Sequence, residues 1–215
     1  MSTVKSWSYS SLSSYEMCPH AWMYERIAKM ERPPSWHLTN GNFVHTLAEK
    51  FLLGEIEELP KQLSKFTKEF NRLREASAKP EEALVLNNSW QLLGGEDAWS
   101  SDDAWLRMKI DATVTDDYII DFKTGKQYPD HIKQGRLYAN TKMKLNPDIN
   151  SVEVEFWYLN SGEVSSFLFE RETLDEDIAN WEAKVEAMHN DNAYEPRPHQ
   201  YCKNCFVKHL CTAYN

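Results

Sequence analysis

The chain has 215 residues, of which 41% are hydrophobic and 13% aromatic, with eight tryptophans. This content of core-forming residues excludes a disordered protein, and the length suits one folded domain better than two. The formal net charge of −9 excludes a surface that is basic throughout, so any binding of nucleic acid would depend on a local basic track.

The apolar patterning indicates a protein outside the membrane. No apolar run approaches the roughly 18 residues that cross a bilayer, and residues 1–11 lack the apolar stretch of a signal peptide. We therefore expect a cytoplasmic protein with no membrane partner. Disulfides are rare in a reducing compartment, so the four cysteines are better tested against metal-site patterns.

Residues 1–100 are predicted to be mainly helical. Ser8, Ser10 and Ser11 are N-cap candidates for a helix that runs to about Ala28. Apolar residues at helical spacing predict three more helices, at Asn42–Leu53, Lys61–Glu75 and Glu81–Leu93.

Residues 101–170 are predicted to carry the sheet, because their apolar residues alternate with polar ones. The expected elements are strands at Leu106–Val114 and Tyr118–Lys123 around a turn, a helix from about Asp130 to Met143, and strands at Val152–Leu159 and Val164–Glu170. Residues 171–215 are expected to hold a final helix after Thr173, with Glu176 completing a capping box, and a cysteine-bearing tail. We expect one domain over residues 1–215.

The hairpin turn predicts which side chains meet across the first two strands. With a loop at Thr115–Asp117 and Val114 opposite Tyr118, Asp111 faces Asp121 and Lys109 faces Lys123. The opposite face is then apolar, with the pairs Ala112 and Ile120, Val114 and Tyr118, and Ile110 and Phe122.

Two facing carboxylates destabilise a strand pair unless a cation lies between them. Asp111 and Asp121 would suit magnesium or manganese, which prefer oxygen ligands and polarise phosphodiesters. Lys123 would position a water molecule or offset charge on a phosphate. The alternative is a solvated face with an ordinary cross-strand salt bridge.

Four motifs follow one another in the chain. They are Gly41-Asn-Phe-Val-His45, Met108-Lys-Ile-Asp111, Ile120-Asp121-Phe-Lys123-Thr-Gly125 and Gln134-Gly-Arg-Leu-Tyr138. This order resembles the RecB-like branch of the PD-(D/E)XK nucleases, from Ser8 to Cys211, with about residues 55–100 unassigned. Met108 departs from the glycine that this family often has there.

The resemblance implies a fold class, an α/β restriction-endonuclease-like core in which helices flank a mixed central sheet. It further implies that His45, Asp111 and Asp121 ligate a metal ion with the backbone carbonyl of Phe122, and that Lys123 is the catalytic lysine. The alternative for His45 is an ordinary helix histidine. Glu49 lies one helical turn after His45, either as a partner that orients it or as a solvated residue.

Gln134 and Tyr138 are four residues apart, so both project from one helix face and could contact DNA. Lys133 and Arg136, with Lys142 and Lys144 further along, make this helix locally basic. The alternative is a solvated amphipathic helix.

The four cysteines are spaced as one cluster and one remote partner. Cys202, Cys205 and Cys211 lie in the tail, and Cys18 lies in the first helix. Four thiolates select zinc or an iron–sulfur cluster, and zinc sites more often show two C-x-x-C knuckles. The spacing resembles the [4Fe-4S] site of AddB-type nucleases and CRISPR-associated adaptation nucleases, which would join the N-terminal helical region to the C-terminal segment. Zinc, with His199 or His209 as spare ligands, and unliganded cysteines are the alternatives.

We therefore expect a metal-dependent deoxyribonuclease, an exonuclease on single-stranded DNA ends or overhangs in recombination, repair or DNA processing. The first alternative is a non-catalytic DNA-end-binding or assembly subunit with the same fold. The second is a zinc-stabilised hydrolase of RNA or another phosphodiester. A homo-oligomer or a helicase or recombination partner is compatible with the pattern.

Overall fold

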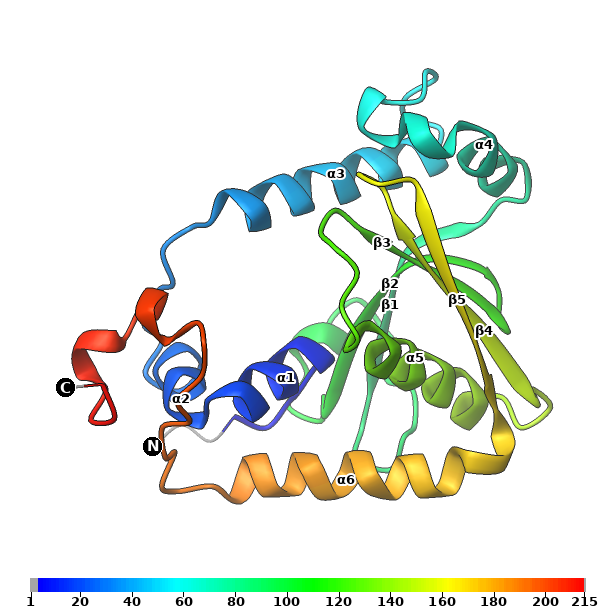
Figure 1. The fold of residues 1–215 in the computed structure, drawn as a ribbon. Helices are drawn as coiled ribbons and strands as arrows, with labels where there is room; N and C mark the ends of the chain where they lie inside the picture. Colours follow the sequence, from blue (N-terminus) through cyan, green and yellow to red (C-terminus); the bar gives the residue numbers. More distant parts are fainter. Residues whose placement is uncertain (1–3, 215) are drawn as a thin grey trace.

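The computed structural model describes residues 4–214 as a mixed five-stranded sheet with helices on both faces (Figure 1). This architecture confirms the α/β fold class that the sequence predicts. Residues 1–3, which begin the segment expected to lack a signal peptide, lie outside the described residues. None of the helices in the described part is both long and apolar enough to span a membrane.

The strands are ordered in space as they are in the chain, and every neighbouring pair is antiparallel except β3 and β4, which are parallel. Their bounds are β1 Lys79–Leu86, β2 Leu106–Thr115, β3 Tyr118–Lys123, β4 Ser151–Tyr158 and β5 Glu163–Glu170. A parallel pair needs a crossover between its strands, and α5 (His131–Leu145) provides it.

The remaining helices divide between the two faces of the sheet (Figure 1). One core packs against α1 (Tyr9–Met17), α2 (Pro19–Arg26), α5 and α6 (Leu174–Asn190). The other packs against α3 (Trp36–Leu52), the 3₁₀ turn Lys61–Phe66 and α4 (Thr67–Glu75). The sheet is therefore buried on both faces, and the strand ends between the two helical layers are free to carry a site.

Two predicted helices differ from the structure. The segment expected as helix Glu81–Leu93 begins in β1, whose apolar end Leu84–Leu86 is buried. The helix expected to reach about Ala28 is broken at Cys18, which has extended φ and ψ of −159° and 102°. The break has a local cause, because the residue before a proline is disfavoured in helical conformation and Pro19 follows.

Three smaller expectations about helices are also corrected. The helix expected to begin at Asn42 begins at Trp36, where the Ser35 hydroxyl accepts the amide of Leu38. The helix expected over Lys61–Glu75 is a 3₁₀ turn followed by α4. The predicted capping box is absent from the start of α6, because Thr173 donates its hydroxyl to Glu170 and Asp177 instead of capping the helix.

The hairpin register is correct in its middle and wrong at both ends. Ala112 pairs with Ile120 as predicted, but a bulge puts Thr115, and not Val114, opposite Tyr118. Beyond Ala112 the predicted pairing of Asp111 with Asp121 is replaced by a hydrogen bond from a backbone amide to the Asp111 carboxylate, described below.

The pleat of β2 also changes phase at Asp111. Met108 and Ile110 point into the core beneath α5 and α6, whereas Ala112 points into the core beneath α3 and α4. Strict alternation would put all three on one face, as the sequence analysis assumed. The neighbouring Glu81 has a positive φ of 49°, so both strands are irregular at this level.

Candidate functional site

Three side chains that could hold a metal ion meet at this irregular point from different elements. His45 from α3, Glu81 from β1 and Asp111 from β2 each offer a ligand atom within 4.8 Å of the other two. His45 Nδ1 lies 3.0 Å from Asp111 Oδ1. Two ligands of an octahedral magnesium or manganese ion lie roughly 3–4 Å apart, so the spacing suits one small divalent cation.

The position of His45 follows from the packing of α3. Val44, Ala48 and Phe51 are buried against the sheet, which turns His45 toward the open end of β2. Gly41 lies one turn earlier and close to the chain that leaves β3, since a Cβ there would sit 3.4 Å from the Thr124 hydroxyl. Helix and sheet therefore approach closely near the site.

Asp111 is oriented by the backbone of the next strand. The amide of Phe122 donates to Asp111 Oδ2 over 2.7 Å, which takes the place of a ladder hydrogen bond. Burial, followed by the charge of Asp121, raises the pKa of Asp111, while His45 lowers it. Burial lowers the pKa of His45, but the hydrogen bond to Asp111 and the nearby carboxylates outweigh it and leave that pKa raised.

Asp121 and Lys123 are directed toward α5 and form a second group. Lys123 Nζ lies 2.6 Å from Asp121 Oδ2 and donates to Gln134 Oε1 over 2.8 Å. Gln134 Nε2 in turn donates to the Tyr138 hydroxyl over 2.6 Å. That hydroxyl lies 3.1 Å from both Asp121 Oδ1 and the carbonyl oxygen of Lys109.

The charge of Asp121 is compensated by Lys123. Asp121 is only 2% exposed, and its Oδ2 lies 2.6 Å from the Lys123 ammonium, although without a hydrogen bond of good geometry within residues 4–214. A buried carboxylate is costly unless a charge compensates it, and the lysine supplies that charge. In the group of His45, Glu81 and Asp111, the two carboxylates are donors that suit magnesium and manganese, whereas the imidazole is a donor for transition-metal ions.

The remaining predicted site residues lie around these groups. Glu49 lines the same groove as His45 and Asp111. Lys133 pairs with Asp130 at 2.8 Å, and Arg136 pairs with Asp177 at 2.9 Å. Both of these cations, which were predicted to contact DNA, thus have an acidic partner. Asp130 directly precedes α5, and Asp177 lies in α6.

Comparison with known protein families agrees with this architecture. The model of the PD-(D/E)XK nuclease superfamily matches residues 6–212. The chain belongs to this superfamily. The mixed sheet with flanking helices is accordingly a restriction-endonuclease-like fold, as the sequence predicts. A comparison with curated protein sequences finds no match.

Two solved structures are similar to this chain in fold at low sequence identity. The protein SSO0001 aligns with a TM-score of 0.53 and 14% identity, over 100% of this chain and 90% of its own. A protein from Eubacterium rectale, provisionally described as an exonuclease, aligns with a TM-score of 0.56 and 16% identity, over 94% of this chain and 87% of its own.

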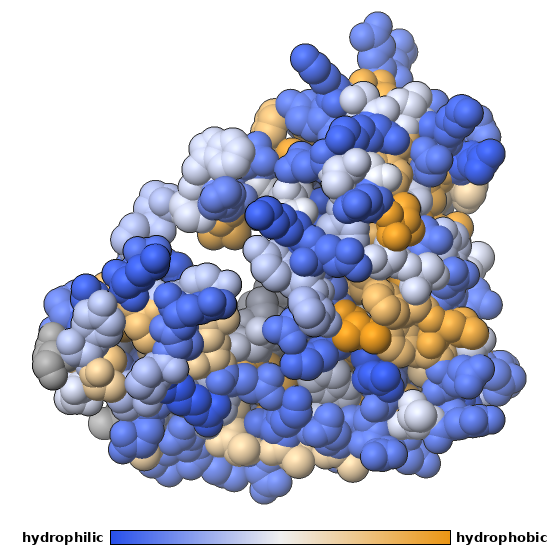
Figure 2. All heavy atoms as spheres, in the orientation of Figure 1, coloured by the Kyte–Doolittle hydropathy of each residue, from blue (hydrophilic) through white to orange (hydrophobic). Residues whose placement is uncertain are grey.

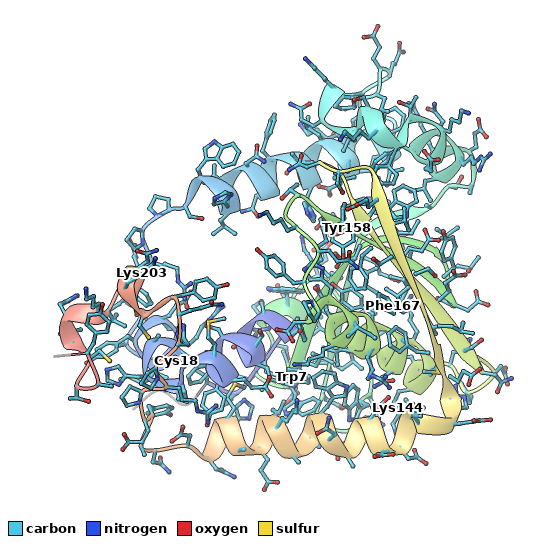
Figure 3. All side chains as sticks on the ribbon, in the orientation of Figure 1. Trp7, Cys18, Lys144, Tyr158, Phe167 and Lys203 are labelled. Atoms are coloured by element: carbon cyan, nitrogen blue, oxygen red, sulfur yellow. The ribbon has the colours of Figure 1, made fainter. Side chains whose placement is uncertain are left out.

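The four cysteines of this PD-(D/E)XK chain line one pocket, at the junction of α1, α2 and the C-terminal segment. Figure 3 shows Cys18 beside the segment that carries Lys203. All four are free thiols, and the amide of His199 donates to the Cys202 sulfur over 3.2 Å. In the described part of the chain the cysteines do not form a group whose sulfurs lie within 4.8 Å of one another.

Glu81 is the site residue that sequence reasoning missed. It was assigned to a helix, where it would have no relation to Asp111, but it lies in β1 at the level of Asp111 and pairs with Lys109 at 2.9 Å. The available signal was the apolar run Ala83–Leu86 after Pro80, which is short enough for a strand.

Proposed function

We propose that the chain hydrolyses DNA phosphodiester bonds with a divalent cation, as an exonuclease on single-stranded ends or overhangs. The observation that carries this proposal is the convergence of His45, Glu81 and Asp111 within 4.8 Å, beside the charged pair of Asp121 and Lys123. Metal ligands next to a partly buried lysine are the parts that phosphodiester hydrolysis needs.

His45, Glu81 and Asp111 are the proposed ligands, with Asp121 and the carbonyl of Phe122 completing the set. When bound, magnesium or manganese would supply charge that polarises the phosphodiester and lowers the pKa of a water molecule. The amide of Phe122 fixes Asp111, and Glu49, which lines the same groove, is the proposed partner that orients His45.

Lys123 is the proposed catalytic lysine, which offsets negative charge on the scissile phosphate. Gln134 and Tyr138 act through it as positioning residues. Gln134 Oε1 accepts a hydrogen bond from Lys123 and thereby aims the ammonium, while Tyr138 holds Asp121. Tyr138 is only 4% exposed, so a direct contact with DNA would require it to leave these partners, whereas Lys133 and Arg136 remain our candidates for phosphate contacts at the rim.

Cys18, Cys202, Cys205 and Cys211 are the proposed ligands of a [4Fe-4S] cluster. All four cysteines line one pocket, which suits a shared metal centre. A tetrahedral zinc ion with Zn–S bonds of about 2.3 Å needs sulfurs roughly 3.8 Å apart, and no three of the four described thiols lie within 4.8 Å of one another. The cluster would fasten the C-terminal segment to α1 and α2. Free thiols suit a reducing compartment such as the cytoplasm.

Digestion of end-labelled single-stranded, double-stranded and circular DNA tests the activity. Wild type with manganese or magnesium should shorten linear single strands and stop when a chelator is added. Asp121→Ala and Lys123→Ala should lower the rate by about 10²-fold or more. Lys68→Ala, which removes an exposed lysine of α4, should leave it unchanged.

A non-catalytic DNA-end-binding subunit is the rival proposal. A wild type that binds DNA ends but cleaves no form of DNA under any of these conditions would establish that rival. Cleavage of circular single strands at the rate of linear ones would refute the exonuclease mode alone.

A further inference from the structure

A groove runs from the proposed cation site along the start of α3. His37 and Thr124 line both the groove that contains His45 and Asp111 and a second groove beside it. The second groove has one exposed aromatic ring on each wall, Trp36 from α3 and Tyr128 from the segment between β3 and α5. The two aromatic rings therefore lie on a path that leads directly to the candidate catalytic groups.

Both rings are far more exposed than aromatic side chains usually are. Trp36 is 72% exposed and Tyr128 is 53% exposed, whereas Trp7 and Trp22 are each 1% exposed. Trp36 contacts the ring of His37, and Tyr128 contacts that of His131, both in edge-to-face geometry. Each ring thus has an aromatic neighbour and still leaves more than half of its residue exposed, at a cost that a packed core would have avoided.

Apart from the two rings, the groove is lined mostly by uncharged hydrogen-bonding side chains. Its polar side chains include Asn40, Thr124, Gln127 and Asn160, with Lys126 as its lysine and Glu163 as its acid. Amide and hydroxyl groups contact sugars and phosphates without a large electrostatic field. This composition suits a nucleic-acid strand bound chiefly through its bases, which agrees with the net charge of −9.

We propose that Trp36 and Tyr128 stack on unpaired bases of single-stranded DNA and thereby guide a strand end to the cation site. This inference rests on the proposed nuclease function and names the groups that would select its substrate. Aromatic rings stack on any base whose face is free, and in a duplex those faces are covered. Figure 2 shows an opening between α3 and the lobe formed by α1, α2 and the C-terminal segment, which leaves a strand room to approach.

Binding of fluorescent oligo-dT in the presence of a chelator tests the stacking without cleavage. Trp36→Ala and Tyr128→Ala should each weaken binding about 5- to 150-fold, the range for removal of one stacked ring. Trp36→Phe should restore most of the loss at its position. Trp99→Ala is the matched control, since Trp99 is 43% exposed but does not line this groove.

Two further probes separate stacking from general damage. An abasic strand of equal length should bind wild type and Trp36→Ala equally, and a blunt duplex should be insensitive to the substitution. Equal oligo-dT affinity of wild type and both alanine variants would overturn the inference, as would an equal loss on the abasic strand.

The result that would contradict the proposed function differs from the result that would overturn the stacking inference. If wild type cleaves nothing but Trp36→Ala still weakens oligo-dT binding, the stacking groove is established and the catalytic proposal is wrong. If wild type cleaves single strands and both alanine variants bind and cleave like wild type, the reverse holds.

Discussion

The Tyr138 hydroxyl connects the candidate catalytic residues to the backbone of the sheet. It accepts a hydrogen bond from Gln134 Nε2 and lies within hydrogen-bond distance of Asp121 and of the carbonyl of Lys109. Burial, followed by the charges of Asp121 and Asp111, raises the pKa of Tyr138 well above its ordinary value, so the hydroxyl stays protonated and remains a donor. We therefore expect Tyr138 both to stabilise the fold and to position the candidate catalytic residues.

Tyr138→Phe should lower both stability and activity. The unfolding free energy should fall by about 1–3 kcal/mol, because buried polar partners are left unsatisfied. The cleavage rate should fall about 10- to 100-fold, the range for losing a group that orients catalytic or metal-binding side chains. Urea denaturation and a single-strand digestion measure the two effects separately.

Tyr15→Phe provides the control for Tyr138→Phe. The Tyr15 hydroxyl donates to Asp191 over 2.8 Å, away from the candidate site, so its loss should affect stability and leave cleavage unchanged. Equal cleavage rates for Tyr138→Phe and wild type would remove the positioning role.

The local pattern of the sequence located some of the candidate residues, and the family resemblance added others. Asp111, Asp121 and Lys123 stand out because two strands and a short turn fix their relation locally. The resemblance put His45 with Asp111, and the structure has these two side chains 3.0 Å apart. The contact of Asp121 with Tyr138 was not predicted, because no local pattern encodes the packing of α5 against β3.

A buried ion pair at Glu82, the residue after Glu81, joins β1, β2 and α5. Glu82 accepts hydrogen bonds from Lys142, Lys79 and Thr113. Burial raises the pKa of Glu82, but these donors outweigh it and lower the pKa to about 2. Lys142 is 4% exposed, so it belongs to the core and not to the basic track for DNA that the sequence analysis assigned to it.

Glu82→Gln should destabilise the fold in a pH-dependent way. At pH 7 the loss should be about 3 kcal/mol, because Lys142 would keep a buried charge with only exposed Asp116 as partner. A lowered pKa stabilises the fold fully above the ordinary value near 4.5 and progressively less as pH falls toward about 2.

The difference between Glu82→Gln and wild type should therefore shrink from pH 5 to pH 3 in urea denaturation. A difference that stays constant over this range would contradict the ion-pair account.

The C-terminal segment lies against α1 and α2 with little regular structure of its own. It consists of short 3₁₀ turns, and most of its side chains other than Val207 are at least partly exposed. A segment with so few buried apolar contacts depends on other links to stay in place.

Substitution of Cys205 by serine should release the segment without unfolding the sheet. We expect loss of iron in elemental analysis, faster proteolysis after residue 190 and a retained circular dichroism spectrum of the remaining domain. Zinc in place of iron in anaerobically purified wild type would refute the cluster, and unchanged proteolysis of Cys205→Ser would refute its role as a fastener.

Helices and strands were predictable where the burial of one of their faces gave a regular hydrophobic period in the sequence. Clear periods mark β3, β4, β5 and α5. The structure matches the predicted bounds of these elements within about two residues. β1 was missed because its first half carries Lys79, Glu81 and Glu82, which are poor strand formers, and its pairing partner lies far along the chain.

The whole molecule brings distant parts of the chain to one end of a sheet. α3 contributes a histidine from one helical layer, α5 contributes Gln134 and Tyr138 from the other, and the strands between them contribute the carboxylates. The acidic total of −9 is compatible with binding DNA because the proposed recognition relies on a cation and on aromatic rings.

Manganese binding measured by isothermal titration calorimetry tests the convergence of His45, Glu81 and Asp111 most directly, since it requires no substrate. Wild type should bind manganese saturably, and Glu81→Ala and His45→Ala should each weaken the affinity at least about 10-fold. Glu163→Ala, which removes a carboxylate from the neighbouring groove, should bind like wild type. Equal affinities for wild type, Glu81→Ala and His45→Ala would contradict the account.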